Sequence, residues 1–196
     1  MKATKMLAAA TLVGLMVPLA ACSGNGEETS DKASPTLADK TTRTLASVIA
    51  GQSELSQVSD AMAEAGLAGV FDGPGSYTVL VPENSAFEAL GKTGKTLTDA
   101  AHRPELVAVL RDHILPGALT TAAIETAIAE NNGSVEMRTM GGNTVTFTQE
   151  DGKIVVTGAD GSRATLDGQA IAASNGVAMP ISGLLKKAAP PATAQQ

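Results

Sequence analysis

Apolar residues in the first half of the chain recur at the spacing of an α-helix. In residues 53–71 they include Leu55, Val58 and Met62, at steps of three and four. Ser53 precedes them, and serine is a favourable N-cap. The pattern predicts a helix over this segment with one buried face.

Two further segments show helical periodicity. Residues 102–115 place Pro104 in the first turn, where its missing N–H is no loss, and carry an apolar stripe that continues to Ile114. Residues 120–133 form an amphipathic piece that ends at Gly133, a residue common just after a helix C-terminus. We expect both segments to be helices.

The hydrophobic pattern changes to short β-type runs in the second half of the chain. Turn sequences containing Gly, Asn and Asp separate these runs, as in hairpins. An earlier strand is expected at residues 77–81, followed by a stop at Pro82. Helices followed by antiparallel strands predict an α+β fold and not a parallel-sheet nucleotide fold. The expected later strands are 134–140, 144–150, 153–158, 162–168 and 169–174.

The amino-terminal residues have the layout of a secretory signal peptide. Lys2 and Lys5 precede an uncharged run of about 16 residues, shorter than the roughly 20 that a membrane-spanning helix needs. Residues 1–21 are therefore expected to be a signal peptide and not a permanent transmembrane anchor. Its loss would take the formal net charge from −6 to −8.

Leu19 to Cys22 read Leu-Ala-Ala-Cys and resemble the bacterial lipobox, in which the cysteine takes a diacylglyceryl group and becomes the new amino terminus. We expect Cys22 to be lipidated. The alternative is ordinary cleavage after Ala-x-Ala, with Cys22 a bystander. Ser23 follows the cysteine in place of an aspartate, so lipoprotein sorting by resemblance implies the outer membrane in a two-membrane cell.

Composition divides the rest of the chain into a tether, one domain and a tail. Residues 22–43 are rich in Ser, Thr, Gly and charged residues and predict a flexible tether. Residues 188–196 predict a disordered tail, which leaves 44–187 as a single domain of common size. The four aromatic residues are too few to dominate the core, so the core is expected to be aliphatic.

Charge and cysteine content exclude several classes of function. The single cysteine leaves no pair for a disulfide, and the chain has no phosphate loop and no metal-ligand motif. We expect no catalytic, metal or cofactor site. Clustered Lys and Arg are also absent, so nucleic acid is not an expected partner. The membrane is an expected partner, which the protein would contact through its amino-terminal lipid.

Three sequence motifs resemble those of fasciclin domains. They are YTVLVPENSAFEAL at 77–90, LRDHILPG at 110–117 and IAASNGVAMPISGLLKK at 171–187. Their order and gaps cover essentially the whole domain. The resemblance implies a β-wedge of mainly antiparallel strands with helices packed at one side, used for adhesion to matrix, cells or envelope components.

Each motif also has a physical interpretation. In the first motif, Asn84 or Ser85 could cap a short helix, with Glu88 completing a capping box for Ser85, while Phe87 faces inward. In the last motif, Asn175 and Gly176 are expected to supply the two positive-φ positions of a tight turn. We expect these roles to be structural.

The second motif contains His113, followed by Pro116 and Gly117 at its close. Catalysis would require a nucleophile and an orienting carboxylate near this histidine. We expect a structural role, with a buried imidazole hydrogen-bonded to backbone. Asp112 replaces the tyrosine usual in the family, and Met179 departs from the last motif; both place transfer of the family's adhesive surface in question.

Other polar segments are predicted to have no special chemistry. Asp160 and Asp167 are expected to be turn residues, because the alternating ligands of a calcium loop are missing. The sequence GKTGKT at 91–96 lacks the spacing of a phosphate loop and is expected to be a solvated loop.

The sequence thus predicts an exported, membrane-anchored lipoprotein of the cell envelope with one fasciclin-like domain. This domain is expected to be a non-catalytic adhesion or binding module, whose partner is an envelope or extracellular protein or a polysaccharide. One alternative is an envelope hydrolase that uses His113. The other is a small-molecule carrier, which would need a sizeable apolar pocket.

Overall fold

The computed structural model of the chain describes residues 42–97 and 99–186. The predicted signal peptide 1–21, Cys22, most of the tether 22–43 and the tail 188–196 lie outside the described residues.

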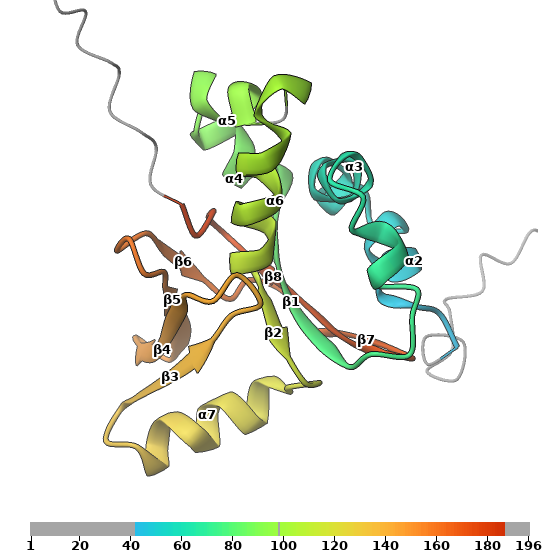
Figure 1. The fold of residues 1–196 in the computed structure, drawn as a ribbon. Coiled ribbons are helices and arrows are strands. Elements are labelled where there is room, and N and C mark those ends of the chain that lie inside the picture. Colours follow the sequence, from blue (N-terminus) through green and yellow to red (C-terminus); the bar gives the residue numbers. More distant parts are fainter. Residues whose placement is uncertain (1–41, 98, 187–196) are drawn as a thin grey trace, which may run out of the picture. The chain divides into compact units, whose positions relative to one another are not determined.

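Two four-stranded sheets and six α-helices make up the domain (Figure 1). One sheet has the order β2-β1-β8-β7 and the other β3-β4-β5-β6. All neighbouring strands are antiparallel except β1 and β8, where Tyr77 pairs with Gly176 and Pro82 with Ile181. The fold is α+β with mainly antiparallel strands, as the sequence predicts. The strands are β1 (Tyr77–Pro82), β2 (Ile114–Pro116), β3 (Ser134–Arg138), β4 (Thr144–Glu150), β5 (Lys153–Thr157), β6 (Arg163–Thr165), β7 (Ile171–Ala173) and β8 (Gly176–Ile181).

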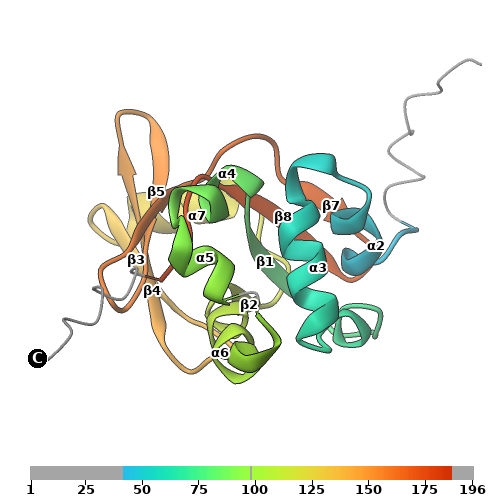
Figure 2. The ribbon, with the colours of Figure 1, turned by 90° about the horizontal axis from the view of Figure 1, so that it is seen from above.

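The helices lie on two sides of the first sheet. Helices α2 to α6 gather on one side, which faces the viewer in Figure 2, while α7 lies on the other side against β3 and β4 (Figure 1). The helices are α2 (Leu45–Ala50), α3 (Ser56–Glu64), α4 (Asn84–Ala89), α5 (Lys92–Leu97), α6 (Arg103–Asp112) and α7 (Thr121–Glu130). Short 3₁₀ turns occupy Ser53–Leu55, Ala68–Val70 and Ala100–His102.

The first sheet is buried on both faces, and its central strands separate two hydrophobic cores. Val79 and Val81 of β1 pack into the core beneath the helices. Leu80, between them, packs into the second core, together with Met179 of β8 and Phe147 of β4. This alternation follows from the period of two along a strand. The residues of β1 and β8 in the first and last motifs thereby contribute to both cores.

The predicted helix over 53–71 is wrong in its extent and its cap. Ser53 lies in a 3₁₀ turn and does not cap a helix; its hydroxyl donates to Glu54. The α-helix begins only at Ser56, and Gly66, with φ of 71°, follows its end. The apolar spacing was right for α3, but a tight turn precedes it and a glycine breaks it.

The other helix predictions need two corrections. The helix predicted over residues 102–115 extended too far. Helix α6 ends at Asp112, and Ile114 belongs to β2, where it pairs with Val79. The predicted loop at 91–96 is instead largely helix α5. Gly94 lets this helix approach α4, since a Cβ there would lie 2.5 Å from the Phe87 carbonyl oxygen.

Candidate functional site: the motif residues and nearby cavities

His113 lies at the C-terminal end of α6 and is 1% exposed. Its Nδ1 lies 2.8 Å from the Val109 carbonyl oxygen, so this nitrogen carries the proton and donates it. Its Nε2 accepts a hydrogen bond of 2.9 Å from the Leu185 backbone N–H. The imidazole therefore connects α6 to the end of the described chain, with backbone partners on both nitrogens, as expected from the sequence.

Burial controls the protonation of this histidine. Loss of solvent around the ring lowers the pKa of His113, while the Val109 hydrogen bond and the charges of Asp112 and Asp160 act in the opposite direction. The ring is therefore held neutral. Neither nitrogen is open to a substrate in this arrangement, so the geometry offers no general base here.

Asp112 connects α6 to the turn between β3 and β4. Its carboxylate accepts bonds of 2.9 and 3.0 Å from the Asn143 side-chain amide and one of 3.1 Å from the Thr139 hydroxyl. Gly141 makes room for it, because a Cβ there would lie 2.1 Å from Asp112 Oδ1. Asp112 thus has a structural role.

Asp112→Ala is expected to lower the free energy of unfolding by about 1.5 kcal/mol, because it removes hydrogen bonds to a charged acceptor. Urea denaturation at pH 7 measures this. Asp167→Ala, at an exposed position outside the strands and helices, is the control and is expected to change stability by less than about 0.5 kcal/mol. Equal effects of the two substitutions would contradict the role assigned to Asp112.

Pro116 and Gly117 close the second motif at the edge of the first sheet. Pro116 ends β2, and Gly117 has a φ of 87°, which favours glycine. The Gly117 carbonyl accepts a hydrogen bond of 2.8 Å from the fully buried Thr78 hydroxyl, which itself accepts one of 2.7 Å from the Leu119 N–H. Sequence analysis did not single out Thr78, because a threonine within a strand carries no distinguishing signal.

The first motif is arranged differently from the expectation. Pro82 ends β1 and Phe87 is buried, as predicted, but neither Asn84 nor Ser85 caps α4; the N-cap is Glu83, without a side-chain bond. The Asn84 side chain instead contacts the start of α3. It accepts from the Gln57 N–H at 3.0 Å and donates to the Ser53 carbonyl and the Ser56 hydroxyl. Asn84 is thus a tertiary contact and not a local cap.

Asn175 lies in the turn between β7 and β8, but Asn175 and Gly176 do not supply the two predicted positive-φ positions. Only Gly176 has a positive φ, of 153°. Gly176 allows β1 and β8 to approach each other, since a Cβ at this position would lie 2.0 Å from the Tyr77 carbonyl oxygen. The Asn175 side chain is 9% exposed; its Oδ1 accepts from the Leu45 N–H at 2.8 Å, and its Nδ2 donates to the Phe71 and Gly73 carbonyls.

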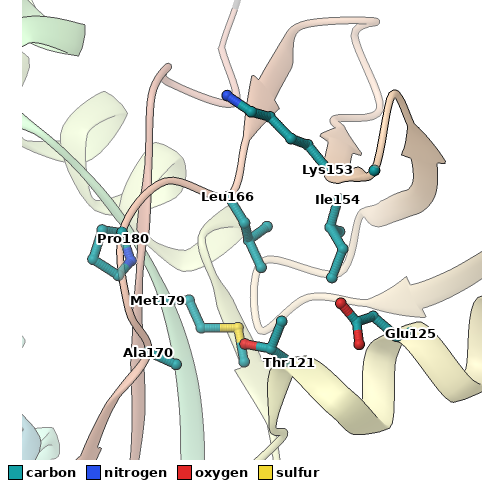
Figure 3. Close-up of a pocket in the computed structure, with 10 residues that line it drawn as sticks. Thr121, Glu125, Lys153, Ile154, Leu166, Ala170, Met179 and Pro180 are labelled. Atoms are coloured by element: carbon teal, nitrogen blue, oxygen red, sulfur yellow. The ribbon is translucent and has the colours of Figure 1, made fainter.

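Three small cavities open beside these elements. One of about 290 Å³ lies between α3 and α6, next to Asp60 and Glu64. A second of about 270 Å³ lies beside Asp112 and Asp160, whose carboxylates are engaged by neighbouring groups. The third, of about 170 Å³, lies between α7, β5 and β8 and includes Met179 in its lining (Figure 3). All three are smaller than the usual pocket for a drug-sized ligand, roughly 300–1,000 Å³.

Asp160 lies in a turn, as predicted, whereas Asp167 lies in an irregular segment after β6 and not in a turn. Asp160 Oδ1 accepts from the Ser162 N–H at 2.9 Å, and Asp167 Oδ1 accepts from the Gly168 N–H at 3.0 Å. Within residues 42–97 and 99–186, no three His, Asp or Glu side chains come together as metal ligands. Among those same residues, no helix has the length and apolar character required to cross a membrane.

Comparison with known proteins agrees with this fold and its motifs. Protein sll1483 of the cyanobacterium Synechocystis is 29% identical over 178 residues, which is 89% of this chain and 92% of that protein. A solved FAS1 domain pair from the insect cell adhesion molecule Fasciclin I superposes with a TM-score of 0.66 at 14% identity, over 74% of this chain. The chain spans 51% of that domain pair, and the likeness shows the fold alone. A family model described as Fasciclin domain matches residues 53–187. The chain therefore belongs to the fasciclin domain family.

Proposed function

We propose that the chain is an exported, lipid-anchored protein whose fasciclin domain is a non-catalytic adhesion or binding module at the cell envelope. The observation that carries the proposal is the match of the adhesion-type fasciclin domain to residues 53–187. The site geometry supports it, because His113 and Asn175 direct their polar atoms at backbone groups of the same domain. Recognition is then left to the outer surface.

The alternatives have less support. A hydrolase that uses His113 would need a free ring nitrogen beside a second catalytic group, but backbone groups engage both nitrogens. A small-molecule carrier would need a larger apolar pocket than the three described cavities supply. A purified chain that hydrolysed ester, peptide or glycoside substrates, and lost turnover in a folded His113→Ala variant, would favour the hydrolase.

The proposed anchor is a diacylglyceryl group on Cys22, followed by the tether that ends near Arg43. The composition of this tether predicts flexibility, and about 20 residues of that kind would reach roughly 25 Å, enough to lift the domain clear of the lipid headgroups. Anchored copies on one surface also bind a partner surface at many points at once, which raises the apparent affinity without any new contact.

Cys22→Ser is expected to move the protein from the membrane fraction to the soluble fraction, because the hydroxyl cannot take the diacylglyceryl group. Immunoblotting of fractionated cells measures this, and Ser23→Ala is the matched control that keeps the cysteine. Intact mass of the wild-type protein should include the lipid. An unmodified Cys22, or a Cys22→Ser protein that stays in the membrane fraction, would contradict the anchor.

Adhesion itself is tested in cells. Deletion of the gene is expected to weaken attachment or aggregation, and added Cys22→Ser protein is expected to compete with the anchored form. Attachment that is unchanged by deletion would refute the proposed function.

A further inference from the structure

The cavity between α7, β5 and β8 has an apolar floor. Ile154 of β5 and Met179 of β8 are 4% and 1% exposed, and half-buried Leu166 completes the floor. Figure 3 shows these three side chains directed toward a common space. The floor includes Met179, where the chain departs from the last family motif.

The mouth of this cavity carries polar groups that have no partner within the domain. Glu125 and Thr121 lie one helical turn apart on α7, and neither side chain has a hydrogen-bond or ion-pair partner among the described residues. In Figure 3 the Glu125 carboxylate is turned toward the cavity, whereas the Lys153 chain is directed away from it. The charged group that faces the cavity is therefore an unpaired carboxylate.

The charges around the mouth favour a cation. Asp151 and Asp167 are exposed and adjoin the lining residues Gly152 and Leu166 in sequence. Nearby, Glu150 and Arg163 neutralise each other in an ion pair. Of the two charged residues that line the cavity, Glu125 faces it and Lys153 is directed away, so the mouth favours a positively charged group.

The size of the cavity points to one side chain. An apolar cavity of about 150 Å³ takes up a benzene molecule, so about 170 Å³ accommodates a four-carbon stem. A lysine has such a stem and a charged tip, and lysine side chains commonly lay the stem on apolar surface. On the basis of the adhesion function, we propose that this cavity receives a lysine side chain of a partner polypeptide, with its ammonium on Glu125 and Thr121.

Methyl-resolved NMR of the purified full-length Cys22→Ser chain tests this with three blocked amino acids as probes. Nα-acetyl-lysine N-methylamide is expected to shift the Met179 and Ile154 methyl signals saturably, with a Kd of about 1 mM, ordinary for a molecule of this size. The norleucine analogue has an apolar stem of similar length but no ammonium, and the glutamate analogue reverses the charge. Both are expected to bind at least about fivefold more weakly.

Two substitutions locate the binding. Glu125→Gln is expected to weaken binding of the lysine probe about fivefold, whereas Glu130→Gln, at another exposed carboxylate on the same helix, leaves it unchanged. Ala170→Leu fills the cavity from its wall and is expected to abolish the shifts. If Ala170→Leu does not fold, the comparison of Glu125→Gln with Glu130→Gln still shows whether the lysine probe binds beside Glu125.

The outcomes separate this inference from the adhesion function. Preference for the glutamate probe, as Lys153 and the start of α7 would produce, overturns the assignment of lysine. Equal binding of norleucine also overturns it, as does the absence of saturable shifts with any probe. In these cases cell attachment still depends on the gene if the domain is an adhesion module, whereas attachment that is independent of the gene refutes the module itself.

Discussion

Asn175→Ala is expected to lower the free energy of unfolding by about 4 kcal/mol. The substitution removes three hydrogen bonds and leaves the Leu45 N–H and the Phe71 and Gly73 carbonyls without their partner. Each buried polar group that loses its partner costs about 1–3 kcal/mol. The bonds span 104 and 130 residues of sequence, so α2 and the turn before β1 should loosen together. Urea denaturation measures the loss.

Asn131→Ala is the matched control for Asn175→Ala. It makes the same chemical change at an exposed position, where the side chain donates one bond of 2.7 Å to Ala127, and is expected to cost less than about 1 kcal/mol. Asn175→Asp keeps the acceptor for Leu45 but places a carboxylate against two carbonyls, so it should also destabilise strongly. A loss below about 1 kcal/mol for Asn175→Ala would show that Asn175 does not hold these segments together.

The second large effect is a pH dependence of stability that originates at His113. Burial holds the pKa of His113 below its ordinary value near 6.5 in the folded chain, so between those two values the unfolded chain binds more protons. Stability is therefore fully present above about pH 6.5 and is lost as the pH falls toward the folded-state pKa. From pH 7 to pH 5 we expect stability to fall progressively. Protonated Nε2 could no longer accept from Leu185.

Urea titrations at pH 7, 6 and 5 measure this dependence in three proteins. His113→Ala is expected to be about 3 kcal/mol less stable at pH 7, because Val109 and Leu185 lose their partner and a cavity remains. Its stability should vary little between pH 7 and 5. His102→Ala, at the only other histidine, should keep the wild-type slope. If the stability of His113→Ala depended on pH as strongly as that of the wild type, the pH dependence would originate at another residue.

The second sheet could be predicted from the sequence because its pairing is local. Between β4 and β5, Asp151 and Gly152 have φ values of 50° and 76°, the two positive values that a tight hairpin turn requires. The Asp-Gly sequence predicts this turn, and the alternation of apolar and polar residues on either side of it predicts the two strands. Neighbours in sequence are neighbours in space there.

The first sheet and the sites around it depend on partners that are distant in sequence. Nothing near His113 indicates that its Nε2 meets a backbone N–H 72 residues later. Asparagine is a residue type that favours helix N-caps, yet the side chain of Asn84 forms hydrogen bonds to the start of α3, because the 3₁₀ turn at Ser53–Leu55 packs beside it. The burial of His113 could be inferred from its apolar neighbours, but its partners required the fold.

The parallel pairing of β1 with β8 has a consequence for how the domain forms. One of the two central strands of the first sheet, β8, is the last strand to be synthesised, and it pairs with the other central strand, β1, which emerged about a hundred residues earlier. Contacts of such long sequence separation slow folding, because a large loop must close before they form. The nascent domain therefore lacks the middle of its first sheet until residues 176–181 are available. A late-closing topology of this kind suits the proposed export, in which the chain crosses a membrane unfolded.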